Sequence, residues 1–127
     1  MGIELVLWIH AESIARFGGS EGVRDAGLLA SALERPKHRW ALAPEPPSIG
    51  RLAAAYAFGI ARNHPFTDGN KRTAFVVCFA FLARNGWRVE AEPEELYDVF
   101  LGLAEGRVDE ESLERWLASR LRPHASP

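Results

Sequence analysis

The sequence predicts an all-α protein: a compact bundle of about six helices around two central apolar helices, with at most a minor hairpin or short strand. Apolar residues recur three or four positions apart in most of the chain, and Gly, Pro or Asn separates these segments. Two segments, residues 52–61 and 74–83, are apolar on nearly every side. Because a helix that is apolar all round is buried all round, these two should form the centre.

Composition indicates a single domain without covalent cross-links. The 127 residues are 47% apolar, and a chain of this size buries about two-thirds of its unfolded surface. We expect one domain over residues 1–121 and a frayed C-terminal tail over 122–127. The only cysteine, Cys78, excludes an internal disulfide and a cysteine-based zinc cluster. It should be buried as a small hydrophobic residue.

The chain carries no sign of a membrane span or a secretory signal. Its longest apolar run, residues 74–83, is ten residues long, and a helix needs about 20 to cross a bilayer. The N-terminus lacks the basic flank and the small-residue cleavage site of a secretory signal. We therefore expect a soluble cytoplasmic protein.

The first helix is predicted over residues 4–17. Apolar residues at helical spacing mark its inward face: Leu7, Ala11, Ile14 and Phe17. The glycine pair 18–19 follows, as glycines commonly do just past a helix end. Trp8 is expected in the core, as are Trp87 and Trp116.

The second helix is predicted over residues 26–35, with Asp25 as its N-cap. Its inward residues are Leu29, Ala32 and Leu33. Pro36 should end it, because the residue before a proline is pushed out of helical geometry. A surface loop is then predicted over residues 37–47, which contain three prolines (44, 46 and 47). This loop should expose Trp40.

Four more helices and one extended segment complete the predicted bundle. The third helix spans about residues 48–63, and the fourth ends at the Asn-Gly pair 85–86. Residues 87–92 alternate weakly and form a short strand or an extended link. Pro93 suits the first position of the fifth helix, and Asp109 can cap the sixth. The inward residues of these two helices are Leu96, Val99, Phe100 and Leu103, then Leu113, Trp116, Leu117 and Leu121.

Charge is distributed unevenly, although the formal net charge is only −2. Residues 90–114 contain ten acidic residues and one basic residue, a net of −9, so the rest of the chain carries +7. A basic body could suit an anionic ligand, and solvated helix faces are the alternative. Without a basic run of five or more residues, we expect no direct nucleic-acid binding.

Polar residues concentrate between the two apolar helices, in residues 64–73. Pro65 places His64 on a turn, and Phe66 should anchor the loop in the core. The sequence Asp-Gly-Asn at 68–70 is typical of a turn that leads into a helix. The first backbone N–H groups of that helix have no acceptor within it, so they form an anion site.

The side chains of this loop suit phosphate chemistry. Lys71 and Arg72 provide the two kinds of cation that hold phosphate oxygens. Asp68 is a single carboxylate beside them, and Mg²⁺ is commonly held by one or two carboxylates plus phosphates. His64 can accept a proton near neutral pH. Each has a structural alternative on its own, but their concentration between two apolar helices indicates a phosphoryl- or nucleotidyl-transfer site.

Residues 64–72 resemble the signature of the Fic/Doc family, His-x-Phe-x-(Asp/Glu)-Gly-Asn-x-Arg, and meet every fixed position. A second stretch, residues 17–33, resembles the N-terminal part of the death-on-curing toxins of that family. The similarity runs from about His10 to Gly86. It implies a Fic-like helical fold and the use of ATP and Mg²⁺.

The resemblance also implies a role for each residue of the motif. His64 deprotonates the target hydroxyl, and Asp68 orders Mg²⁺. Lys71 and Arg72 stabilise charge on the phosphoryl oxygens. The residues implied to hold the nucleotide are Gly69, Asn70, Lys71, Arg72 and, outside the motif, Arg62.

One departure separates two reactions within the family. AMP-transferring members usually have glycine at the position of Lys71 and a second arginine at that of Phe75. The death-on-curing branch has lysine, and its toxin transfers the γ-phosphate of ATP to a threonine of elongation factor Tu. The resemblance therefore implies a toxin that arrests translation and pairs with a small antitoxin.

Two alternatives stay open: an AMP-transferase that acts on another protein hydroxyl, and a non-catalytic member that binds a nucleotide or a protein. The intact His64 argues against the second. Residues 37–47 are a candidate loop for docking the target, with a plain connecting loop as the alternative.

Overall fold

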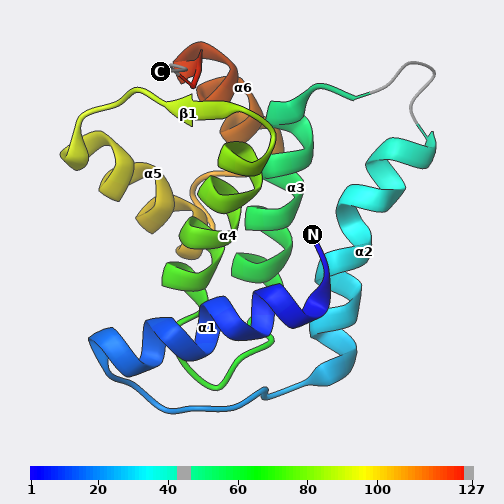
Figure 1. Cartoon of the computed structure of the whole chain (residues 1–127), viewed down its shortest axis with the longest axis vertical. Helices are drawn as coiled ribbons and strands as arrows, with labels where there is room; N and C mark the ends of the chain where they lie inside the picture. Colours follow the sequence, from blue (N-terminus) through cyan, green and yellow to red (C-terminus); the bar gives the residue numbers. More distant parts are fainter. Residues whose placement is uncertain (43–46, 125–127) are drawn as a thin grey trace.

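The computed structural model describes residues 1–42 and 47–124 (Figure 1). Within them the chain forms six α-helices and one pair of antiparallel strands, which confirms the predicted fold class. The elements follow in the order α1 (Ile3–Phe17), α2 (Ala26–Leu42), α3 (Ile49–Asn63), α4 (Asn70–Arg84), β1 (Trp87–Val89), α5 (Pro93–Ala104), α6 (Glu110–Arg120) and β2 (Leu121–Pro123).

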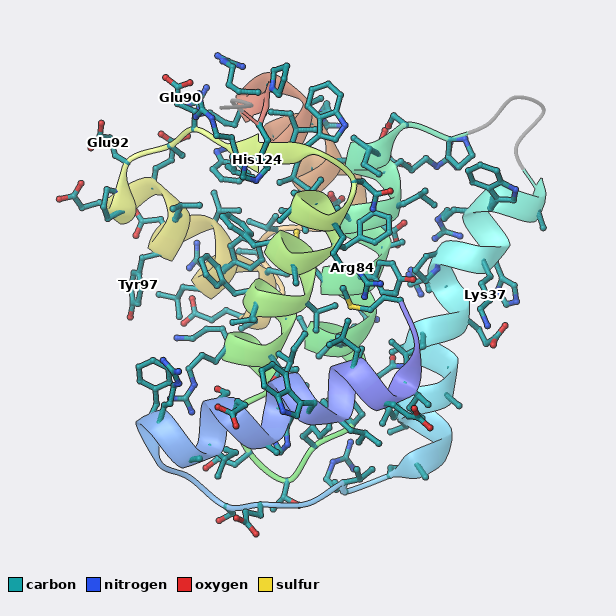
Figure 2. The ribbon with its side chains drawn as sticks, viewed as in Figure 1. Lys37, Arg84, Glu90, Glu92, Tyr97 and His124 are labelled. Carbon is teal, nitrogen blue, oxygen red and sulfur yellow. The ribbon has the colours of Figure 1, made fainter. Side chains whose placement is uncertain are left out.

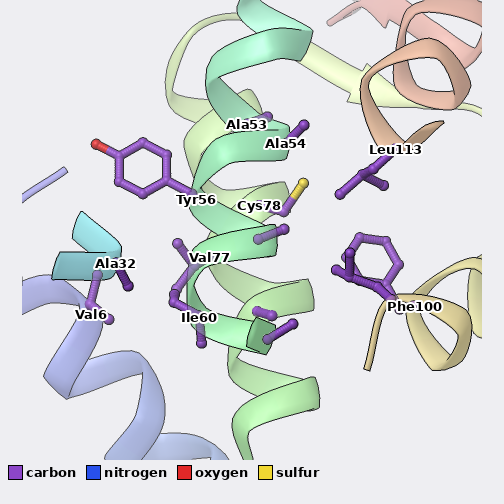
Figure 3. Close-up of a cluster of buried hydrophobic side chains, with 14 of the residues drawn as sticks. Val6, Ala32, Ala53, Ala54, Tyr56, Ile60, Val77, Cys78, Phe100 and Leu113 are labelled. Atoms are coloured by element: carbon purple, nitrogen blue, oxygen red, sulfur yellow. The ribbon is translucent and has the colours of Figure 1, made fainter. Parts of the chain in front are cut away.

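The α3 helix lies at the centre and packs against α2, α4 and α6. Figure 3 shows Val6 of α1 and Ala32 of α2 on one side of α3, and Phe100 of α5 and Leu113 of α6 on the other. The alanines of α3 are buried, so neighbouring helices approach it closely. The closest approach is at Gly59, where an added Cβ would lie 3.0 Å from the Ala32 carbonyl oxygen.

The second apolar helix, α4, is less enclosed than predicted. Val77 and Cys78 are fully buried, as expected. Three of its phenylalanines remain partly exposed: Phe75, Phe79 and Phe81. The prediction of burial on every side is wrong for α4, because α1 and α5 cover it less extensively than α3 does.

The α1 helix has a different buried face from the one predicted. Ile14 is buried, but Ala11 and Phe17 are exposed, and Trp8 is 61% exposed instead of lying in the core. The observed buried face consists of Val6, Ile9, His10, Ser13 and Ile14. Apolar spacing gave the wrong face because two polar residues, His10 and Ser13, are on the buried one.

The α2 helix continues through Pro36 to Leu42, so the prediction that it ends at residue 35 is wrong. Asp25 caps its start as predicted, accepting a hydrogen bond from the Leu28 N–H (3.0 Å). Proline cannot donate to the carbonyl four residues earlier, which is that of Ala32. That carbonyl lies against Gly59, and the packing of α2 on α3 maintains the helix beyond the proline.

The predicted loop over residues 37–47 is therefore helical as far as residue 42, and residues 43–46 lie outside the described part of the chain. Trp40 is 58% exposed, as expected, but it projects from α2. Ser48 caps α3 as predicted, accepting from the Arg51 N–H (3.1 Å).

The C-terminal part follows the prediction, with an addition. Pro93 begins α5, and Asp109 caps α6 by accepting from the Ser112 N–H (2.8 Å). The short strand β1 pairs with β2, so Arg122 and Pro123, expected within a frayed tail, are held in a two-stranded sheet. Trp87 and Trp116, expected in the core, are only partly buried and pack against the edge of the core.

None of the helices in the described residues has both the length and the apolar character to span a bilayer.

Candidate active site

Two residues with left-handed backbone conformations shape the loop between α3 and α4. His64 is the C-cap of α3, has a φ of 48° and is exposed. Gly69, with φ of 75°, is the N-cap of α4, and glycine adopts this conformation without steric cost. The α1 helix crosses the start of α4 at the same end of the molecule (Figure 1).

Asn70 closes the loop from the inside. Its buried side chain accepts a hydrogen bond from the Phe66 N–H (3.0 Å) and donates to the Phe66 carbonyl oxygen (2.9 Å). The Phe66 ring is 1% exposed, as the predicted anchor of the loop should be. Because the Asn70 side chain is engaged with the backbone of Phe66, the group that Asn70 can offer to an anion at the helix end is its backbone N–H.

The first turn of α4 presents free backbone donors to the loop. The first bond of its hydrogen-bond ladder runs from the Thr73 N–H to the Gly69 carbonyl oxygen (2.9 Å). The N–H groups of Asn70, Lys71 and Arg72 therefore have no acceptor within the helix. Together with the helix dipole, they make this end of α4 attractive to an anion.

The Asp68 carboxylate lies beside this helix end and is held by two backbone N–H groups. The Ser20 N–H donates to Oδ2 (3.1 Å), and the Gly69 N–H donates to Oδ1 (2.8 Å). These bonds, that of Ser20 foremost, hold the pKa of Asp68 below its ordinary value, because they stabilise the ionised form. The exposed carboxylate is thus an anion at neutral pH, with lone pairs left for a cation.

Each of the two cations of the motif lies over an exposed aromatic ring. The Lys71 Nζ atom is 5.2 Å from the centre of the Tyr97 ring, and the Arg72 Cζ atom is 5.0 Å from that of Phe17. Figure 2 shows Tyr97 projecting outward from α5. Arg72 Nη2 also donates to the Gly18 carbonyl oxygen (3.2 Å), while its buried Nε has no partner among the described residues. The rings hold both cations at the first turn of α4.

A cleft of about 500 Å³ opens over this arrangement. Its lining contains six of the seven residues that the sequence indicates, together with Thr67: His64, Thr67, Asp68, Gly69, Asn70, Lys71 and Arg72. The seventh, Arg62, does not line the cleft. Its guanidinium lies 5.9 Å from the centre of the Phe58 ring.

Two other clefts are also large enough to be considered as binding sites. One of about 310 Å³ is apolar and shares Lys71 and Arg72 with the first; its other lining residues are Phe75, Pro93, Leu96, Tyr97 and Phe100. Another of about 620 Å³ lies between α2, α3 and α6, and four arginines and four acidic residues line it. Their charges neutralise one another, so that cleft does not select an anion.

The residues present fit a magnesium ion that arrives with a phosphate ligand. The described residues contain no cluster of three or more His, Cys, Asp or Glu side chains that could cage a metal by themselves. Asp68 is a single exposed carboxylate with free lone pairs beside an anion site. This is the donor set by which Mg²⁺ is usually bound, one carboxylate plus phosphates and water.

Several residues of the site lie far from the motif in sequence and are not among the predicted site residues. They are His10, Phe17, Gly19, Ser20 and Tyr97. Two sequence signals point toward some of them: the polar residues His10 and Ser13, three positions apart on the first helix, and the family resemblance of residues 17–33.

Comparison with known proteins gives consistent matches. A family model described as the Fic/DOC family matches residues 2–82. The relatives include "Protein kinase doc" of Escherichia phage P1, which is 36% identical over 110 residues, covering 87% of this chain and 86% of the relative. They also include "Toxin Doc" of Mycolicibacterium smegmatis, 44% identical over 84 residues, covering 66% of this chain and 64% of the relative.

Proposed function

This chain belongs to the Fic/Doc family, and from that premise we propose that it is a cytoplasmic toxin kinase of a toxin–antitoxin pair. It transfers the γ-phosphate of ATP to a hydroxyl of a translation factor similar to elongation factor Tu, and so arrests translation. The observation that carries this proposal is the cleft in which the start of α4, two cations, a carboxylate and an exposed imidazole face one space. A relative named as a protein kinase supports the reaction class.

The geometry supports a division of labour among the residues of the cleft. The backbone N–H groups at the start of α4, with Lys71 and Arg72, bind the phosphate oxygens and stabilise charge on them. His64 accepts the proton of the target hydroxyl while the hydroxyl oxygen forms a bond to the γ-phosphorus. The bond from that phosphorus to the bridging oxygen of ADP breaks, and ADP leaves. Asp68 holds Mg²⁺, which neutralises charge on the phosphates when bound.

Transfer of the γ-phosphate, and not of AMP, is supported by the charges on α4. Phe75, where AMP-transferring members of the family usually have a second arginine, packs in an aromatic cluster, 4.5 Å from Phe79 and 5.0 Å from Phe100 between ring centres. The cations of α4 in the cleft are thus confined to Lys71 and Arg72 in the first turn. AMP transfer to a protein hydroxyl is the second candidate.

The proposed partner of this chain, the antitoxin, is a small protein with a segment that folds on binding. Two exposed aromatic residues beside the cations, Phe17 and Tyr97, are 68% and 60% exposed and offer apolar anchors to such a segment.

Labelled ATP distinguishes the candidate functions. With γ-labelled ATP, Mg²⁺ and a bacterial lysate, the chain is expected to label a band of the size of elongation factor Tu, and α-labelled ATP should leave that band unlabelled. His64→Ala should abolish the labelling without loss of helix content. His38→Ala, which changes an exposed histidine of α2, is the matched control and should retain it. Label from the α-position would establish AMP transfer instead.

A further inference from the structure

His10 is a buried histidine that the proposed reaction leaves without a role. It belongs to α1 and is 4% exposed. Its ring stacks on Phe66, with ring centres 3.9 Å apart and planes inclined by 7°. Its Nε2 atom is 2.8 Å from the carbonyl oxygen of Asp68, which is 58 positions away in the sequence. Since a carbonyl oxygen can only accept, Nε2 carries the hydrogen.

This hydrogen bond fixes a peptide group between two residues that line the cleft. The carbonyl group of the Asp68–Gly69 peptide is held by His10, and its N–H group donates to Asp68 Oδ1 (2.8 Å). The same carboxylate accepts from the Ser20 N–H through Oδ2 (3.1 Å). A peptide plane held on both edges cannot rotate, so the direction of the carboxylate is set together with it.

The start of α4 depends on the same peptide. Gly69 is the N-cap, and its carbonyl oxygen accepts the first bond of the α4 ladder, from the Thr73 N–H (2.9 Å). There is little free space around it: an added Cβ would lie 3.2 Å from Ile14 Cδ1 and 3.8 Å from His10 Nε2. Rotation of the Asp68–Gly69 peptide would therefore redirect both the carboxylate and the leading N–H groups of the helix.

We propose that His10 is a positioning residue for phosphoryl transfer, one that orients the Asp68 carboxylate and the anion-binding end of α4 through the peptide between them. It acts from inside the molecule and contacts neither the nucleotide nor the target. The inference rests on the proposed function for its effect on catalysis, but the contact that it concerns can be tested separately.

Two substitutions separate the hydrogen bond from the packing. His10→Phe keeps a ring to stack on Phe66 but removes the donor. His10→Gln restores a donor, because its amide nitrogen lies about as far from the backbone as ring Nε2. We expect His10→Phe to lower kcat for γ-phosphate transfer about 10–100-fold, the usual effect of losing a partner that orients a ligand-holding group. His10→Gln should recover most of that loss.

A double-mutant cycle tests the route of the effect. If His10 acts through Asp68, then His10→Phe should change kcat little further in a chain that already carries Asp68→Asn. Equal and independent losses in the two backgrounds would overturn the inference, as would equal kcat values for the Phe and Gln variants. Should His10→Phe not fold, His10→Asn replaces it, since its shorter amide cannot reach the Asp68 carbonyl.

Hydrogen exchange gives a readout that needs no activity. In His10→Phe the Ser20 and Gly69 amide hydrogens should exchange faster than in the unsubstituted chain, and in His10→Gln they should not. Unchanged exchange in His10→Phe would overturn the positioning role. If the exchange changes as expected but the unsubstituted chain transfers no phosphate, the positioning of the loop stands and the proposed function fails.

Discussion

At the scale of single residues, the site depends on how closely the segment after α1 approaches the Asp68 carboxylate. An added Cβ on Gly19 would lie 2.6 Å from Asp68 Oδ2, closer than carbon and oxygen atoms can pack. The φ of Gly19 is 116°, a value that residues with side chains avoid. Glycine is therefore needed both for the backbone conformation and for the position of the carboxylate.

Gly19→Ala is expected to lower the rate of phosphate transfer about 10–100-fold, because it displaces the Asp68 carboxylate, the group proposed to hold Mg²⁺. Gly106→Ala is the control, since Gly106 also has a positive φ (79°) but nothing within 4 Å of an added Cβ. The control should destabilise the protein by about 1–2 kcal/mol and leave transfer unchanged. Thermal unfolding and γ-label transfer measure the two effects, and equal transfer rates would contradict the role of Asp68.

The sequence predicts the part of the site that is local. His64, Asp68 and the two cations fall within nine consecutive residues, and a turn that leads into a helix brings such residues together by backbone geometry alone. The contacts of His10 and Ser20 with Asp68 join residues 58 and 48 positions apart. No local periodicity carries that information, because it depends on how α1 crosses the bundle.

At the scale of elements, two glycines of α3 make the packing of the central helix testable. Both Gly50 and Gly59 are buried in the helix. An added Cβ on Gly50 would have its nearest contact at 3.6 Å, whereas one on Gly59 would lie 3.0 Å from the oxygen and 3.1 Å from the Cα of Ala32. The Ala32 backbone belongs to α2 and cannot move without displacing that helix.

The two alanine variants should therefore have opposite effects on stability. Gly50→Ala is expected to raise the free energy of unfolding by up to about 1 kcal/mol, because alanine loses less conformational entropy than glycine in a helix. Gly59→Ala gains the same term but overpacks the α2–α3 contact, which costs about 1–3 kcal/mol. Urea unfolding measures both. Stabilisation by Gly59→Ala would show that α2 and α3 are not packed as closely as described.

A partly buried carboxylate joins α6 to α2. Glu110, at the first position of α6, accepts hydrogen bonds from Arg35 (2.6 Å) and Arg39 (2.8 Å), and its side chain is 12% exposed. Burial alone would raise the pKa of Glu110, but the two arginines outweigh it and lower the pKa below its ordinary value of 4.5. Ionised Glu110 therefore stabilises the folded state above the unfolded pKa, and this stabilisation is lost as the pH falls through the folded one.

Glu110→Gln should reduce the free energy of unfolding at pH 7 by about 1–3 kcal/mol, since it leaves two arginines without their anion. The difference from the unsubstituted chain should shrink as the pH falls below about 4.5. Glu111→Gln, at the exposed neighbouring position, should change the stability by less than about 0.5 kcal/mol. A difference that is independent of pH would contradict the ion-pair explanation.

Local signals predicted the starts of the helices well, and the end of α2 and the buried face of α1 less well. Asp25, Ser48 and Asp109 cap their helices as expected, because a cap depends on neighbouring residues only. The extension of α2 through Pro36 could not be predicted, since packing on α3 compensates for the missing donor. The buried face of α1 was mistaken because His10 packs inward on a polar loop, against the rule that buried faces are apolar.

At the scale of the whole molecule, the bundle places a polar loop at one end of α3 and α4, and other helices hold this loop in position. The α3 and α4 helices supply the ends of the loop, α1 holds its middle, and α5 and α1 contribute the aromatic rings that cover the two cations. All these elements are helical, so the site is built on rigid supports, as positioning of a phosphoryl group requires.

The central claim is that the leading end of α4 binds the triphosphate next to His64. A crystal structure of the chain with Mg²⁺ and a non-hydrolysable ATP analogue tests it most directly. We predict phosphate oxygens on the N–H groups of residues 70–72 and on Lys71 and Arg72, the metal on Asp68, and the terminal phosphate beside the imidazole. Phosphates bound in the charged cleft between α2, α3 and α6, or bound away from His64, would contradict the account.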